Sequence, residues 1–169
     1  MTNSTPIKNQ KKTFTKYYTE SGKSYKIVAT IRHDDECGNG YNTFAITANI
    51  YEIVNKNRKV WIAGGCQHEE IKKHFPELAK YIKWHLCGTD GPMHYIANTL
   101  YLAGDRDCWG HRQGKQRNFE AARVSAIWED ATNEELSLPA DELKQKLIDR
   151  LPALMAEFKK DVEKLGFIY

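Results

Sequence analysis

Hydrophobic and polar residues alternate along several segments in the first third of the chain. Residues 25–32 and 43–53 are rich in β-branched and aromatic side chains, and Phe44, Ile46, Ala48 and Ile50 alternate with other positions in the second segment. A period of two indicates strands with one buried face. Residues 59–63 predict another strand, and residues 14–19 predict a further one before them. We therefore expect an antiparallel β-meander of three to four strands over residues 14–63.

After Gly64-Gly65 the hydrophobic spacing becomes helical, with helices predicted at residues 68–86, 92–102, 118–130 and 141–165. The inward face of the first consists of Ile71, Phe75, Leu78, Ile82 and His85. Pro76 either kinks this helix or begins a second one, and Pro152 bends or breaks the last. Strands followed by about four helices predict an α+β fold with the helices packed on one sheet face. We expect a flexible basic arm at residues 1–12 and a single domain at residues 13–169.

Composition narrows the class of protein. The 169 residues are 41% hydrophobic and 28% charged, as in soluble globular domains. No apolar run reaches the roughly 20 residues of a membrane helix. The polar N-terminus lacks a secretory signal, so we expect a cytoplasmic protein without a membrane partner. Four widely spaced cysteines without a C-x-x-C pair predict reduced thiols.

The formal net charge of +3 is too small to indicate a nucleic-acid partner by itself. The charges are unevenly distributed, however. Residues 1–26 carry six lysines against one glutamate, whereas residues 129–149 carry seven acidic residues against two lysines. These two segments are either solvated surfaces or docking sites for a partner.

Reactive side chains are concentrated at residues 84–99. Asp90 or Gly91 can cap a helix that begins at Pro92, and the helix dipole keeps a His94 imidazole neutral. Asn98 lies four residues on and shares a face with His94. A general acid–base or metal-dependent site is one interpretation, with the candidate residues His85, Asp90, His94 and Asn98. The alternative is a buried histidine and a capping aspartate that only stabilise the fold.

A zinc site is a second interpretation of this region. Its candidate ligands are His85, Cys87 and His94, with Cys108 or His111 from the next loop, although the spacing matches no standard zinc finger. If residues 68–86 formed one helix, His68 and His85 would be about 25 Å apart. They could then share a metal ion only if Pro76 folded the segment back. We expect no other cofactor, and the absence of any standard catalytic motif favours a binding protein over an enzyme.

A long glycine-containing loop at residues 104–118 is the predicted contact surface. It combines a tryptophan with four cations, namely Arg106, Trp109, Arg112, Lys115 and Arg117. Arginine and tryptophan are frequent at the centres of protein interfaces. The same side chains can also bind phosphates and stack on bases.

The segments Trp84-His85-Leu86, Thr89–Tyr95, Ala97–Thr99 and Asp107–Gly110 resemble a family of small uncharacterised proteins encoded by bacteriophages and prophages. The resemblance covers about one sixth of the chain. It implies a counter-defence protein in the host cytoplasm that inhibits a host protein or ribonucleoprotein complex, of the anti-CRISPR or anti-restriction type. A small metal- or His/Asp-dependent nucleic-acid-processing enzyme and a nucleic-acid-binding protein are the alternatives.

Overall fold

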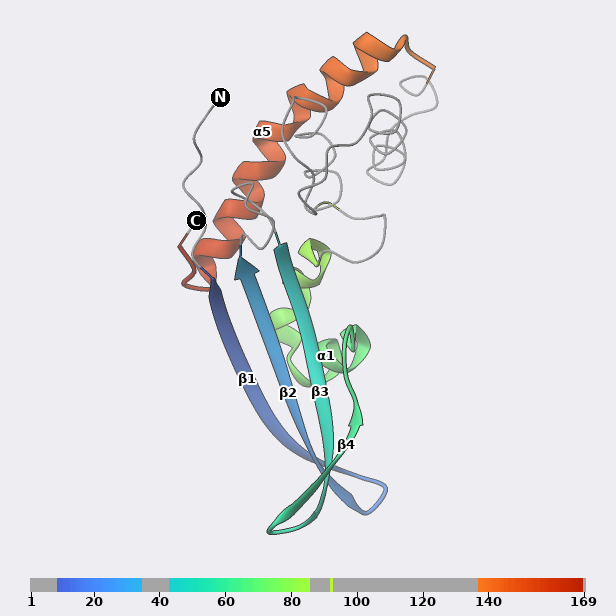
Figure 1. Cartoon of the computed structure of the whole chain (residues 1–169), viewed down its shortest axis with the longest axis vertical. Helices are drawn as coiled ribbons and strands as arrows, with labels where there is room; N and C mark the ends of the chain where they lie inside the picture. The colour runs from blue at the N-terminus through green and yellow to red at the C-terminus, as the bar shows by residue number, and fades with distance from the viewer. Residues whose placement is uncertain (1–8, 35–42, 86–91, 93–136, 169) are drawn as a thin grey trace. The chain divides into compact units, whose positions relative to one another are not determined.

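A computed structural model describes residues 9–34, 43–85, 92 and 137–168. Four strands begin the fold, β1 (Gln10–Glu20), β2 (Lys23–Asp34), β3 (Thr43–Asn55) and β4 (Arg58–Ala63). They lie side by side in chain order, as Figure 1 shows, and β3 pairs with β4 antiparallel. The expected α+β class and the antiparallel meander are therefore confirmed, with four strands.

Two-residue turns set the register of the two hairpins. Ser21 and Gly22 join β1 to β2 with φ values of 50° and 76°, and positive φ at both positions is the requirement of a type I′ turn. The β3–β4 turn is closed by Asn55, whose side-chain oxygen accepts a hydrogen bond from the Asn57 amide at 2.9 Å. The type I′ turn matches the twist of the two strands that it joins. The β3–β4 turn instead uses asparagine, whose side chain favours turns.

One face of the sheet is buried. Ile27, Ala29 and Ile31 on β2 and Ile46 and Ala48 on β3 are fully inaccessible to solvent. They alternate with half-buried residues, as the sequence pattern predicts. Helix α1 (His68–His74) contributes buried Ile71 to the same compact unit, and the ring of Phe75 after it meets the ring of Phe14 on β1 at 6.4 Å.

The predicted helix at residues 68–86 is two elements. Helix α1 ends at His74, and Pro76 begins the 3-10 helix η1 (Pro76–Trp84). A 3-10 helix has three residues per turn, so residues three apart share a face. Phe75, Leu78, Tyr81 and Trp84 follow this spacing and are buried, whereas Ile82 is only half-buried. The half-buried position of Ile82 fits this three-residue spacing, whereas the prediction assumed the 3.6-residue period of an α-helix.

Helix α5 (Ala140–Lys164) belongs to a second compact unit and includes Pro152 in its interior without ending there. Leu143, Leu151, Phe158, Val162 and Leu165 are buried and Leu154 is half-buried, the spacing of three and four residues typical of an amphipathic helix. The Phe158 ring lies 5.4 Å from His33, 5.7 Å from Phe44 and 5.1 Å from Trp84. Edge-to-face and tilted aromatic pairs of this kind add to the stability that burial provides.

In the part of the chain that the structure describes, three helices follow the sheet rather than the expected four. Of the predicted helix at residues 92–102 only Pro92 is described, and the predicted helix at residues 118–130 lies outside the described residues. No described helix combines the length and the apolar composition needed to cross a membrane.

Candidate metal centre

The link between β4 and α1 is held in one conformation by its backbone. Gly65 has a φ of 91°, and its carbonyl accepts hydrogen bonds from the amides of Ala48 and Gln67, both at 2.9 Å. The Gln67 side chain donates to the Gly64 carbonyl at 3.1 Å. These bonds fix the backbone on which Cys66 and His68 stand.

A carbonyl of the neighbouring strand orients the His68 ring. Its Nε2 atom lies 3.1 Å from the backbone oxygen of Ile46, and a carbonyl oxygen can only accept. Nε2 therefore carries the hydrogen, and a neutral His68 ring has its lone pair on Nδ1. Histidines that bind metal ions usually donate their other ring N–H in this way, because the bond fixes the tautomer and the ring orientation.

Cys66 is exposed and carries a thiol rather than a disulfide. It is the one cysteine among the described residues, since Cys37, Cys87 and Cys108 lie outside them. The thiolate of an accessible cysteine is a strong ligand for zinc and other soft or borderline metal ions.

His85 follows the last residue of η1 and is 9% exposed, as expected for a residue on an inward face. The preceding residue, Trp84, is fully buried, and its indole Nε1 donates to Asp161 Oδ2 at 2.8 Å. This bond to α5 restrains the backbone from which the His85 side chain extends.

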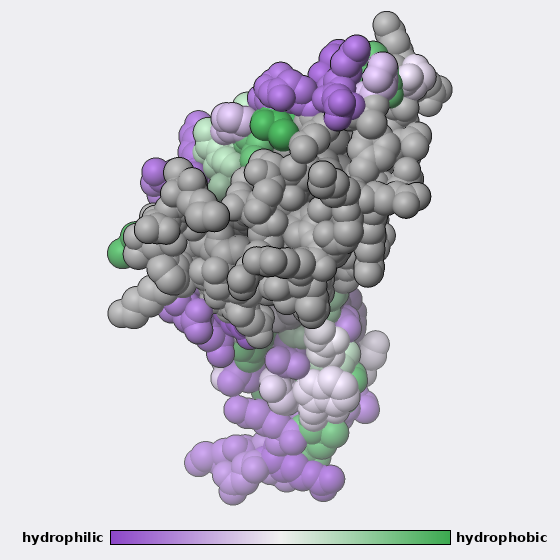
Figure 2. Space-filling view, turned by 45° about the horizontal axis from the view of Figure 1, so that its top comes forward, coloured by the Kyte–Doolittle hydropathy of each residue, from purple (hydrophilic) through white to green (hydrophobic). Residues whose placement is uncertain are grey.

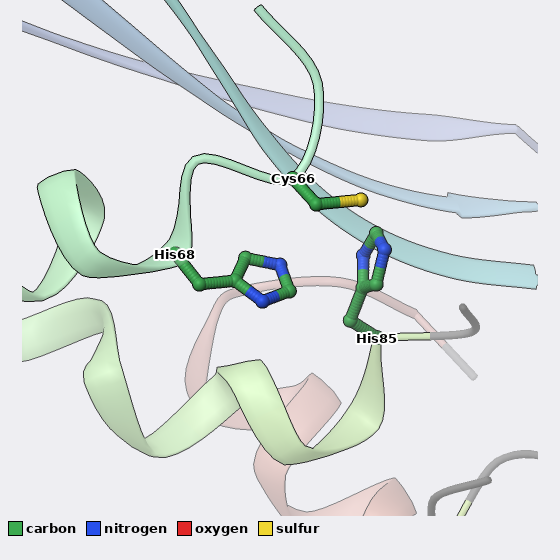
Figure 3. Close-up of side chains that lie close together, drawn as sticks. All are labelled: Cys66, His68 and His85. Carbon is green, nitrogen blue, oxygen red and sulfur yellow. The ribbon is translucent and has the colours of Figure 1, made fainter. Parts of the chain in front are cut away.

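The ligand atoms of Cys66, His68 and His85 all lie within 4.8 Å of one another. Figure 3 shows the three side chains projecting toward one another from the β4–α1 link and the end of η1. A tetrahedral zinc ion at 2.0–2.3 Å from each ligand needs ligand atoms about 3.3–3.6 Å apart. Side-chain movements of about 1.5 Å or less would therefore bring all three into one coordination sphere.

Sequence reasoning predicted only His85 among these three residues. It separated His68 from His85 on the assumption of one continuous helix, and the break at Phe75–Pro76 removes that assumption. Cys66 was missed altogether. The pattern Cys66-Gln67-His68 contained a signal, because two ligands separated by one residue in a tight turn can bind one ion.

The other predicted site residues lie outside the described residues. They are the metal candidates Cys87, His94, Cys108 and His111, the catalytic candidates Asp90, His94 and Asn98, and the contact residues Arg106, Trp109, Arg112, Lys115 and Arg117. The loop at residues 104–118 and the counter-defence role built on it therefore stay predictions.

A third histidine illustrates a different environment. His74 is 8% exposed and stacks on the Tyr18 ring at 4.1 Å. Burial lowers the pKa of His74 below its usual value, and the partly opposing contribution of Glu70 is smaller. Its Nε2 lies 3.4 Å from Glu70 Oε2, close enough for an ion pair but without hydrogen-bond geometry. Burial likewise raises the pKa of Tyr18.

Comparisons with known proteins add no family to this picture. No protein-family model, no curated protein and no solved structure matches the chain.

Proposed function

We propose that this protein is a metal-binding protein that holds a zinc ion through Cys66 Sγ and one ring nitrogen each of His68 and His85. The observation that supports the proposal is the convergence of the three ligand atoms within 4.8 Å. The bond from His68 Nε2 to the Ile46 carbonyl adds to it, because it restrains the orientation of the His68 ring.

The ligand set favours zinc over hard cations. One thiolate and two imidazoles suit zinc, whereas calcium and magnesium prefer carboxylate, carbonyl and water oxygens. Three protein ligands leave one position of a tetrahedron for water, a substrate or a fourth side chain. Binding requires the Cys66 thiolate and neutral histidines, so protons are released and affinity falls as the pH is lowered.

An ion held by all three side chains would stabilise the folded state, because binding requires the folded arrangement of its ligands. A ligand that binds only the folded state contributes about 2.7 kcal/mol when its free concentration is one hundred times its dissociation constant. For a chain of this length we therefore expect chelation to lower the melting temperature by about 5–11 °C.

The test is metal analysis of the purified protein followed by cobalt(II) titration of the metal-free form. We expect stoichiometric zinc and a thiolate-to-cobalt charge-transfer band. Cys66→Ser should remove the band, and His68→Gln or His85→Ala should weaken binding by more than the 10–100-fold typical of outer-shell changes. His68→Gln keeps a side-chain N–H for the Ile46 carbonyl, so it separates ligand loss from loss of that bond.

His74→Gln is the matched control for His68→Gln. His74 is a buried histidine of α1, the helix that begins at His68, and it is not one of the three proposed ligands. It should bind cobalt as the unchanged protein does. A metal-free protein that takes up neither zinc nor cobalt, or ligand variants that bind normally, would exclude the proposed site.

A further inference from the structure

The face of the sheet opposite the buried residues, which we call the open face, carries aromatic side chains on both edge strands. Tyr17 on β1 and Trp61 on β4 are each 60% exposed. In the register of the sheet Trp61 lies beside Tyr51 on β3, which alternates with buried Ile50. Exposed aromatic rings held on the strands of a sheet can serve as platforms on which planar ligands stack.

Trp61 is held in a fixed orientation. Its indole Nε1 donates to Asn49 Oδ1 at 3.2 Å. Gly64 lies beside it, and a Cβ atom there would be 2.5 Å from Asn49 Oδ1 and 3.2 Å from the indole ring. The absence of a side chain at Gly64 therefore allows the ring to be packed on one side and exposed on the other.

This part of the sheet carries an excess of positive charge. Residues 11–32 and 45–63 together contain nine lysines and arginines and only two acidic residues, Glu20 and Glu52. Glu20 pairs with Lys73 of α1 at 3.1 Å, and Glu52 pairs with Lys23 at 3.2 Å, so both glutamates have cationic partners.

Strand alternation and pairing place cations on the open face among the aromatic rings. Lys26 extends over the Tyr17 ring with Nζ 5.8 Å from its centroid, and Lys59 is the cross-strand partner of Ile53 next to Trp61. Lys56 and Arg58 lie in and just after the β3–β4 turn. Figure 2 shows strongly hydrophilic residues at the end of the sheet where the hairpin turns lie.

From these features we propose that the open face binds a single-stranded nucleic acid. Bases stack on Trp61 and Tyr17, and phosphates are neutralised by Lys26 and Lys59. Stacking on side chains requires bases that are not already stacked in a duplex, and cationic grooves with aromatic platforms are the usual means of binding single strands without sequence preference. The excess of positive charge favours a nucleic acid as the occupant, because each of its phosphates carries one negative charge. A protein surface with few acidic residues would not complement this charge. This surface is separate from the proposed metal site, so either can exist without the other.

The test uses fluorescence anisotropy with a labelled single strand of about 12 nucleotides and its duplex. We expect the single strand to bind more tightly than the duplex, with affinity falling steeply between about 50 mM and 200 mM salt. Trp61→Ala should weaken binding roughly fivefold to a hundredfold, and Trp61→Phe should restore part of the loss. Lys26→Gln should reduce the slope of log affinity against log salt by about 0.7.

Lys72→Gln is the matched control for Lys26→Gln. Lys72 is an exposed lysine of α1 that pairs with Glu69, and it has the same charge but does not lie on the sheet. It should leave the affinity and the salt slope unchanged. Circular dichroism of each variant confirms that the sheet is intact. No binding at low salt, equal binding of the duplex, or an equal effect of Lys72→Gln would overturn the proposal.

Discussion

The bond between Trp84 and Asp161 offers a sharp test of how the end of η1 is held. The indole Nε1 donates to Asp161 Oδ2 at 2.8 Å, Trp84 is fully buried and the Asp161 side chain is only 13% exposed. Removing the carboxylate with Asp161→Ala leaves a buried N–H without its acceptor. Hydrogen bonds to charged groups contribute about 1.5–3 kcal/mol, and an orphaned buried donor costs a similar amount.

A chain of this size loses about 2–4 °C in melting temperature for each kcal/mol of lost stability. Asp161→Ala should therefore lower the melting temperature by about 3–12 °C. The exposed contact of Asp161 with Lys164 at 3.7 Å adds little, because surface ion pairs contribute about 0–1 kcal/mol.

Thermal unfolding measures the melting temperature, and urea unfolding measures the free energy of unfolding. Both are followed by far-ultraviolet circular dichroism, which does not depend on the fluorescence of Trp84. Trp84→Phe loses packing as well as the bond, so the two contributions are separated by a double-mutant cycle with Asp161→Ala. We expect a coupling energy of about 1.5–3 kcal/mol. A coupling below about 0.5 kcal/mol would refute the argument that this bond restrains the backbone next to His85.

Two further predictions concern backbone strain and titration. Gly65→Ala should lower the free energy of unfolding by about 1–2 kcal/mol, because Gly65 has a φ of 91°. An added Cβ would meet no atom within 4 Å, so the cost is conformational rather than steric. Urea unfolding measures this change, and an unchanged free energy would contradict the positive φ of Gly65. Burial lowers the pKa of His74, so the unfolded chain takes up its proton more readily. Stability is therefore fully present above about pH 6.5 and falls as the pH drops through the lowered pKa, and His74→Gln should flatten this dependence in unfolding experiments at a series of pH values. An unchanged pH profile in this variant would assign the acid sensitivity to other groups.

The strands were predictable because each carries its own signal. The alternation around Ile46 and Ala48 depends only on which face is buried, and the turn residues mark where the chain reverses. Even β1, in which only Phe14 and Tyr18 recur toward the half-buried face, was found from its β-branched and aromatic composition. The apolar stripe of α5 is equally local, since residues three and four apart on one helix must share a face.

The candidate metal centre was only partly predictable because it depends on a change of chain direction. Pro76 was recognised as a break or a beginning, but the pattern could not distinguish a kinked α-helix from a short α-helix followed by a 3-10 helix. That distinction decides which residues are buried, and it brings His68 within reach of His85. The proposed role of Cys66 depends on the same reversal, so the local pattern Cys66-Gln67-His68 could suggest two ligands but not the third.

Pro152 in the middle of α5 has a consequence for how this helix opens. Proline has no amide hydrogen, so the carbonyl of Ile148 loses the partner that an uninterrupted α-helix would supply. Both halves carry buried residues, but the half that follows Pro152 also includes Phe158, whose ring packs against those of His33, Phe44 and Trp84. Cooperative unfolding units tend to separate where hydrogen bonding is interrupted and packing differs. Amide hydrogens of the half before Pro152 should therefore exchange with solvent through a local opening in which the half after Pro152 stays folded. The helix α5 is continuous in the structure, but its two halves should unfold separately.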